Sequence, residues 1–139
     1  MKKTALLRSF FCTVHLIIHS LFVNLYRKSH RINMKLFFRT IGEGTPLIIL
    51  HGLWGASENW LPIAHLLEDK FQVILPDVRN HGQSPHDEAM NYEEMSNDVI
   101  ELIKDLKLPV RPHIVGHSMG GKIVMALLLK RPELVNRAV

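Results

Sequence analysis

Cysteine is almost absent from this 139-residue chain, which contains only Cys12. A single cysteine cannot form an internal disulfide, and it cannot build a cysteine-ligated metal site by itself. We interpret Cys12 as an apolar residue within an apolar run. The sequence also has no internal repeat, low-complexity tract or interdomain linker, so its length indicates a single domain.

Acidic residues are missing from the first 33 positions, which contain six lysines and arginines. Because the whole chain has a formal charge of +4, residues 34–139 have a formal charge of −2. This larger part of the chain is therefore mildly acidic and offers no basic face to a polyanion. We accordingly expect no nucleic-acid partner.

The first 33 residues differ in kind from the rest. An apolar stretch at residues 10–26 has basic residues on both sides, but polar side chains interrupt it and no clear cleavage site follows. A miscalled start, an export signal, a membrane anchor and a folded helix all remain open. We expect an extension at residues 1–33 and a domain at residues 34–139. We also expect a cytoplasmic protein that meets a membrane only if residues 10–26 anchor it.

Apolar strands and amphipathic helices alternate from Met34 onward. The pattern predicts strands at residues 36–40, 47–50, 71–75 and 113–115, and helices at residues 59–68, 91–107 and 119–130. Asn91 and Glu94 resemble a capping box at the start of the second helix. This alternation indicates an α/β fold with a mostly parallel sheet and helices on both faces. In such sheets reactive groups gather at the carboxyl ends of the strands.

The sequence GHSMG at residues 116–120 lies between the last predicted strand and the last predicted helix. G-x-S-x-G in this context is typical of a nucleophile elbow, in which Ser118 occupies a strained turn. Gly116 and Gly120 would leave room for that turn. Gly121 would let the helix approach the sheet closely.

The loop HGLWG at residues 51–55 follows an earlier strand at the same edge of the sheet. A glycine turn here can direct a backbone N–H to the point reached by the N–H of Met119, and two such donors form an oxyanion hole. We favour that function for the backbone of the loop. For the imidazole of His51 we favour a hydrogen bond to the local backbone.

The polar loop DVRNHGQS at residues 77–84 follows the third predicted strand. We expect an ion pair between Asp77 and Arg79 that stiffens this loop. A triad of Asp77 with His81 or His86 is a weaker alternative, because these residues precede the serine and belong to a loop with its own turn chemistry. The histidines of the two loops lack partners at metal-ligand spacing, so we expect no metal site.

The motifs HGLWG, DVRNHGQS and GHSMGGK, in this order, resemble the alpha/beta-hydrolase superfamily, and within it small bacterial serine esterases and related mitochondrial hydrolases. The resemblance extends from about Met34 to the end of the chain. It implies that Ser118 is the nucleophile and that the N–H groups of Leu53 and Met119 form the oxyanion hole. It also implies a small-molecule ester or thioester substrate, an acyl-enzyme and no cofactor. Elbow or structural roles fall to Gly116, Gly120, Gly121, His51, Gly52, Asp77 and Arg79.

In that superfamily the triad acid and histidine follow the helix after the elbow. No histidine follows Ser118 in this chain, and residues 136–139 read as the beginning of a further strand. We therefore expect the first half of a hydrolase, without the acid, the base or the segment that caps the pocket. The strand that contains Ile114 and Val115 would then be an exposed edge prone to aggregation.

The main functional hypothesis is therefore an amino-terminal portion of a serine ester hydrolase, active within a longer chain or with a complementing fragment. A lyase or acyltransferase of the same superfamily is a second hypothesis, because the same elbow and oxyanion loop serve those reactions. An inactive hydrolase-like protein is a third. Ser118 argues against the dehalogenase and epoxide-hydrolase branches, which use Asp at the elbow.

Overall fold

The structure is a computed structural model, and it describes residues 34–139. The predictions for Cys12, for the apolar stretch at residues 10–26 and for the extension at residues 1–33 lie outside the described residues. No helix within residues 34–139 has the length and apolar character needed to cross a membrane.

Within residues 34–139, five strands form one sheet in the order β1-β3-β2-β4-β5. Their bounds are β1 Phe38–Ile41, β2 Thr45–Leu50, β3 Phe71–Pro76, β4 His113–Gly116 and β5 Arg137–Ala138. β1 runs antiparallel to β3, and the other pairings are parallel. The predicted mostly parallel sheet is therefore confirmed. The first strand begins two residues later than predicted, because Met34 and Leu36 pack into the core instead.

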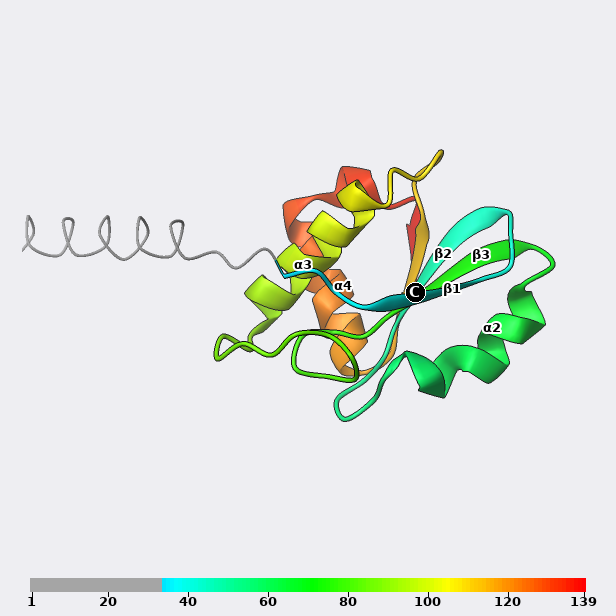
Figure 1. Ribbon diagram of the computed structural model, residues 1–139. Helices are drawn as coiled ribbons and strands as arrows, with labels where there is room; N and C mark the ends of the chain where they lie inside the picture. The colour runs from blue at the N-terminus through cyan, green and yellow to red at the C-terminus, as the bar shows by residue number, and fades with distance from the viewer. Residues whose placement is uncertain (1–33) are drawn as a thin grey trace, which may run out of the picture. The chain divides into compact units, whose positions relative to one another are not determined.

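The helices are α2 Leu61–Leu67, α3 Tyr92–Asp105 and α4 Met119–Lys130, with short 3-10 helices at η1 Ser57–Trp60 and η2 Pro132–Leu134. α3 and α4 cover one face of the sheet and α2 lies on the other (Figure 1). The helix predicted at residues 59–68 is thus divided at Leu61. Pro62 lies in the first turn of α2, where its missing N–H costs nothing.

Alternating side chains of the strands fill the two cores. Ile48, Ile74 and Ile114 pack with α3 and α4, whereas Leu47 and Val73 pack on the side of α2. Successive residues of a strand point to opposite faces, and both faces are covered here, so residues 47–50 of β2 and 73–75 of β3 must be apolar. This explains the continuous apolar runs in these two strands.

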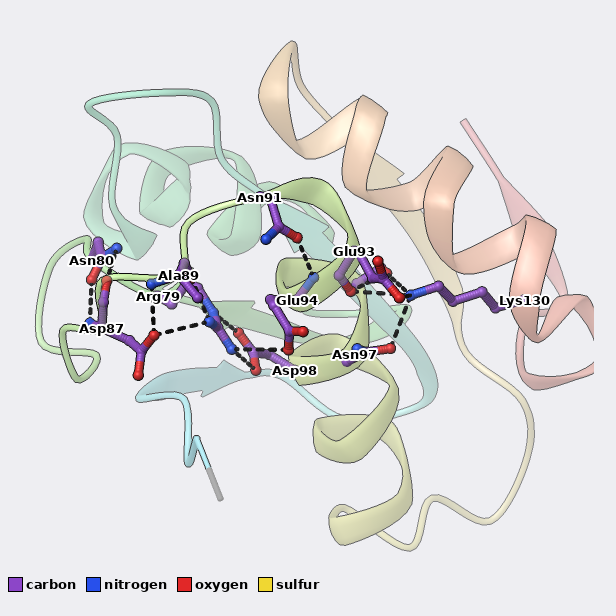
Figure 2. A network of polar contacts seen from close by, with 11 residues as sticks. Arg79, Asn80, Asp87, Ala89, Asn91, Glu93, Glu94, Asn97, Asp98 and Lys130 are labelled. Carbon is purple, nitrogen blue, oxygen red and sulfur yellow. Dashed lines mark hydrogen bonds and ion pairs between the residues drawn. The ribbon is translucent and has the colours of Figure 1, made fainter. Parts of the chain in front are cut away.

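Asn91 caps α3, but the predicted capping box forms only in part, because no hydrogen bond from the Asn91 N–H to the Glu94 side chain accompanies this cap. α3 is also linked to α4. The Asn91 side chain accepts a hydrogen bond from the Glu94 N–H at 2.9 Å. At the far end of α4, the Lys130 ammonium donates to the Ser96 hydroxyl at 3.2 Å and to the Asn97 side-chain oxygen at 3.0 Å (Figure 2). These contacts hold the two helices together on one face of the sheet.

The predicted exposed edge at Ile114 and Val115 is wrong. β5 pairs with β4, placing Ala138 opposite Ile114. The Val139 N–H donates to the Ile114 carbonyl at 3.0 Å, and the Gly116 N–H donates to the Val139 carbonyl at 2.9 Å. Residues 136–139 do begin a further strand, as predicted, and within residues 34–139 this short strand forms the edge of the sheet next to β4.

Two leucines of α4 allow a matched test of this packing. Leu127 is fully buried, whereas Leu129 on the same helix is 88% exposed. Leu127→Ala should lower the free energy of unfolding by about 2 to 5 kcal/mol because it leaves a cavity in the core. Leu129→Ala should change it by no more than about 0.5 kcal/mol. Urea denaturation measures both, and equal effects of the two variants would contradict this placement of α4.

Candidate active site

Ser118 lies in a sharp turn between β4 and α4. Its φ is 52° and its ψ is −110°, and its side chain is exposed. A non-glycine residue at positive φ is strained, and such strain is held in place only by the surrounding structure. The turn has the strand-to-helix position and the backbone strain that the elbow interpretation requires.

The glycines on both sides of this serine are required by close backbone packing. A Cβ atom on Gly116 would lie 2.5 Å from the backbone of Gly120, and a Cβ atom on Gly120 would lie 2.4 Å from the carbonyl oxygen of Leu50. Gly121 is less constrained, since the closest atom to its added Cβ would be the Gly116 carbonyl oxygen at 3.1 Å. The two glycines of the motif therefore bring β2, β4 and α4 together.

The pairing of β2 with β4 brings the HGLWG loop to the elbow. Leu50 lies opposite Gly116 in this parallel pair, and the His117 N–H donates to the Leu50 carbonyl at 3.0 Å. An added Cβ on Gly52 would lie 2.9 Å from Nδ1 of His117. The loop after β2 and the turn after β4 are therefore in direct contact.

Two backbone N–H groups in this region remain available. The N–H of Met119 lies in the first turn of α4, where it has no partner within the helix. Within residues 34–139 neither it nor the N–H of Leu53 donates to another backbone group. Leu53 is exposed beside the elbow. Such free N–H groups can stabilise a developing negative charge.

His51 is buried and bridges two backbone groups. Its Nδ1 lies 2.8 Å from the Gly52 carbonyl oxygen, and its Nε2 accepts a hydrogen bond from the Val78 N–H at 3.0 Å. The predicted hydrogen bond to local backbone is confirmed. Burial is the largest cause that lowers the pKa of His51, and the neighbouring His81 lowers it further.

The predicted ion pair between Asp77 and Arg79 is wrong. The Asp77 carboxylate instead accepts hydrogen bonds from the Ser57 N–H at 2.6 Å and the Gln83 N–H at 2.8 Å. Gly82 packs so closely on this carboxylate that an added Cβ would lie 2.1 Å from one oxygen. Asp77 therefore organises the backbone of two loops, and backbone N–H groups take the place of the expected guanidinium.

Arg79 binds across to α3 (Figure 2). Its guanidinium donates to both oxygens of Asp98 at 2.5 and 2.7 Å and to the Ala89 carbonyl at 2.6 Å. Asp87 and Glu94 lie at 3.8 and 4.0 Å. The hydrogen bonds to Asp98 are the main reason that the pKa of Arg79 is raised. This bidentate pair fastens the polar loop to the helix.

Asp98 is a structural partner that the sequence analysis did not predict, although its position in α3 indicates that it is buried. It lies three residues after Met95 and four before Leu102, so it occupies a position on the apolar face of α3. A charged residue at such a position is buried only if it is paired. A charged residue on the apolar face of α3 predicts a buried partner, but this pattern does not identify Arg79 as that partner.

His81 and His86, the two histidines after β3, make no hydrogen bond to Ser118. The Nδ1 atom of His81 lies 2.9 Å from the Arg79 carbonyl oxygen, and His86 is exposed. Because the Asp77 carboxylate is occupied by backbone N–H groups, the alternative triad does not form. Within residues 34–139 no group of three potential metal ligands comes together.

A depression of about 440 Å³ opens beside the elbow and does not include Ser118. It is lined by His51, Gly52, Leu53, Trp54, Gly55, Asn59, Trp60, Ile63 and His117. A second depression, of about 580 Å³, lies near the amino end of β4 and includes Arg111 and Pro112. The second one is at the opposite edge of the parallel strands from Ser118, so it is not part of this site.

A family model described as the alpha/beta hydrolase fold matches residues 45–139. The sn-1-specific diacylglycerol lipase ABHD11 of Xenopus laevis is 45% identical over 98 residues, covering 69% of this chain and 31% of that protein. Esterase YbfF of Escherichia coli is 37% identical over 97 residues, covering 70% of this chain and 38% of that protein. The chain thus spans about a third of the length of these curated relatives.

A solved structure titled "Marine microorganism esterase" is also similar. It superposes with a TM-score of 0.73 and 51% sequence identity, covering 76% of this chain and 40% of that one. The described strands and helices therefore correspond to a part of a larger hydrolase fold.

The two neighbouring glycines of α4 give a test of the elbow packing. Gly120→Ala should lower the free energy of unfolding by about 2 kcal/mol or more, because its Cβ would overlap the Leu50 carbonyl. Gly121→Ala is the matched control and should stay within about 1 kcal/mol, since the gain in helix propensity offsets its milder contact. Chemical denaturation compares them, and a tolerated alanine at 120 would refute the close approach.

Burial of His51 predicts a loss of stability in mild acid. Because its pKa in the folded chain is lowered below the ordinary 6.5, the unfolded chain takes up a proton first as the pH falls. The stabilising contribution is complete above pH 6.5 and is lost below it, by at most about 1.4 kcal/mol per pH unit.

His51→Gln keeps an acceptor for Val78 but does not titrate, so it should reduce the difference in unfolding free energy between pH 7.5 and pH 5.5. The exposed His86→Gln should keep the wild-type difference. An unchanged difference in His51→Gln would contradict the prediction.

Proposed function

Because this chain belongs to the alpha/beta-hydrolase fold family, we propose that it is the amino-terminal part of a serine hydrolase of carboxylic esters or thioesters. The observation that carries the proposal is Ser118, exposed at positive φ in the turn between β4 and α4 and flanked by Gly116 and Gly120. Relatives named as lipases and esterases support the ester substrate. The catalytic roles of individual residues are part of this proposal.

In the proposed reaction Ser118 Oγ bonds to the ester carbonyl carbon. The carbonyl oxygen becomes negatively charged and accepts hydrogen bonds from the N–H groups of Leu53 and Met119. The bond to the alcohol oxygen then breaks, and the alcohol leaves with the proton that the serine gave up. Water adds to the acyl-enzyme, releases the carboxylic acid and restores the hydroxyl group.

The serine needs a group that accepts its proton. Within residues 34–139 no imidazole is hydrogen-bonded to Ser118, and His51 and His81 are bound to backbone groups. Since the chain spans about a third of its relatives' length, we propose that polypeptide outside these residues supplies the base. The cytoplasmic location and the domain boundary at residue 34 stay predictions from the sequence.

Acyl transfer is the second candidate function. A relative from Saccharomyces cerevisiae, 48% identical over 98 residues, is named "Probable alcohol acetyltransferase". The same acyl-enzyme would then be resolved by an alcohol, which displaces Ser118 and forms a new ester. Product analysis with an activated ester, with and without added ethanol, separates the two candidates: hydrolysis gives only the acid, and transfer gives the ethyl ester.

A fluorophosphonate probe tests the nucleophile in the 139-residue chain. We expect slow covalent labelling of the wild-type protein, because an oxyanion hole alone retains part of a hydrolase's rate advantage. Ser118→Ala should abolish the labelling. Ser96→Ala should keep the labelling, because Ser96 is buried and its hydroxyl makes hydrogen bonds within α3 and to Lys130 of α4. Labelling that survives in Ser118→Ala would refute Ser118 as the nucleophile, and absence of labelling in a longer chain that contains the proposed base would refute the proposed function.

A further inference from the structure

The peptide unit between Gly52 and Leu53 contains both a bound carbonyl and a free N–H. His51 Nδ1 lies 2.8 Å from the Gly52 carbonyl oxygen, and the Gly55 N–H donates to the same oxygen at 3.0 Å. This peptide is trans, as are the other peptide bonds within residues 34–139. In a trans peptide the C=O and N–H point in opposite directions. The two contacts to the carbonyl therefore direct the Leu53 N–H away from the buried imidazole.

The second ring nitrogen of His51 decides which nitrogen carries the proton. The Val78 N–H donates to Nε2 at 3.0 Å, so Nε2 must be the unprotonated acceptor. In the neutral ring the proton is then on Nδ1, which makes Nδ1 the donor to Gly52. Burial lowers the pKa of His51 and so favours this neutral form.

Val78 is a well-fixed donor. Its side chain is fully buried, and the preceding Asp77 carboxylate binds the N–H groups of Ser57 and Gln83. Arg79, on its other side, is fastened to α3 through Asp98. The backbone after β3 is therefore held from both directions, and His51 connects it to the HGLWG loop.

We propose that His51 is a positioning residue that fixes the direction of the Leu53 N–H by holding the Gly52 carbonyl, in the tautomer selected by the Val78 N–H. This inference rests on the proposed function, in which the Leu53 N–H binds the oxyanion. A merely structural role predicts only a change in stability when His51 is replaced. A positioning role predicts a change in the rate of bond formation at Ser118.

Two amide side chains separate the two hydrogen bonds of His51. In His51→Asn the amide occupies the place of Nδ1, so it keeps a donor for the Gly52 carbonyl and loses the acceptor for Val78. In His51→Gln the amide reaches the place of Nε2, so it keeps the acceptor for Val78 and loses the donor. If donation to Gly52 positions the hole, the two variants should differ.

The rate of fluorophosphonate labelling measures this difference in the 139-residue chain. His51→Gln should lower the first-order rate of labelling at saturating probe about tenfold or more, with little change in the probe's binding constant. His51→Asn should stay within about threefold of wild type, although it removes a buried acceptor. Ser96→Ala is the control for lost stability without a change in this rate. Equal rates in both His51 variants, whether unchanged or reduced together, would overturn the proposal.

Nuclear magnetic resonance gives a second measurement that does not need a reactive serine. Long-range proton–nitrogen spectra should show His51 with its proton on Nδ1, and the Leu53 amide signal should move more in His51→Gln than in His51→Asn. A proton on Nε2, or equal movement in both variants, would overturn the positioning role. If the 139-residue chain is not labelled, labelling requires the base that we propose for the remaining polypeptide, and this measurement still decides the role of His51.

Discussion

The approach of the α4 backbone to the end of β2 is the constraint on which the site depends. Gly120 has no side chain and lies against the Leu50 carbonyl, which also accepts the His117 N–H. Any side chain at residue 120 would separate α4 from the sheet. Since Ser118 lies between these two contacts, its strained backbone is held from both sides. Packing of this kind can sustain a conformation that an isolated turn would relax.

The polar loop after β3 provides a fixed backbone beneath the HGLWG loop of the site. Asp77 and Arg79 are both buried: Asp77 accepts hydrogen bonds from the N–H groups of Ser57 and of Gln83 in its own loop, and Arg79 pairs with Asp98 of α3. Removing charges from water is unfavourable unless they are well paired, so these contacts leave the loop few alternative conformations. The loop contributes no catalytic group in the proposed function. Its contribution is a fixed backbone, which His51 then meets through the Val78 N–H.

Motifs that depend on local backbone could be predicted from the sequence. The elbow at residues 116–120, the cap at Asn91 and the hydrogen-bonded His51 are confirmed as local structures. Pairings between distant residues could not be predicted in the same way. Arg79 has four acidic residues nearby in the fold or the sequence, and only packing of the loop on α3 selects Asp98. The predicted exposed edge at β4 is also wrong, because residues 136–139 pair with this strand.

The sequence by itself determined the alternation of strands and helices, the family and the chemical type of the candidate nucleophile. These follow from the periodicity of apolar residues and from short motifs whose glycines and serine have local roles. Only the tertiary structure decided which groups satisfy Asp77, Arg79 and His51. The reason is physical: a buried charge or imidazole can bind many partners of suitable chemistry. Which one it meets depends on how loops from β2, β3 and β4 converge at one edge of the sheet.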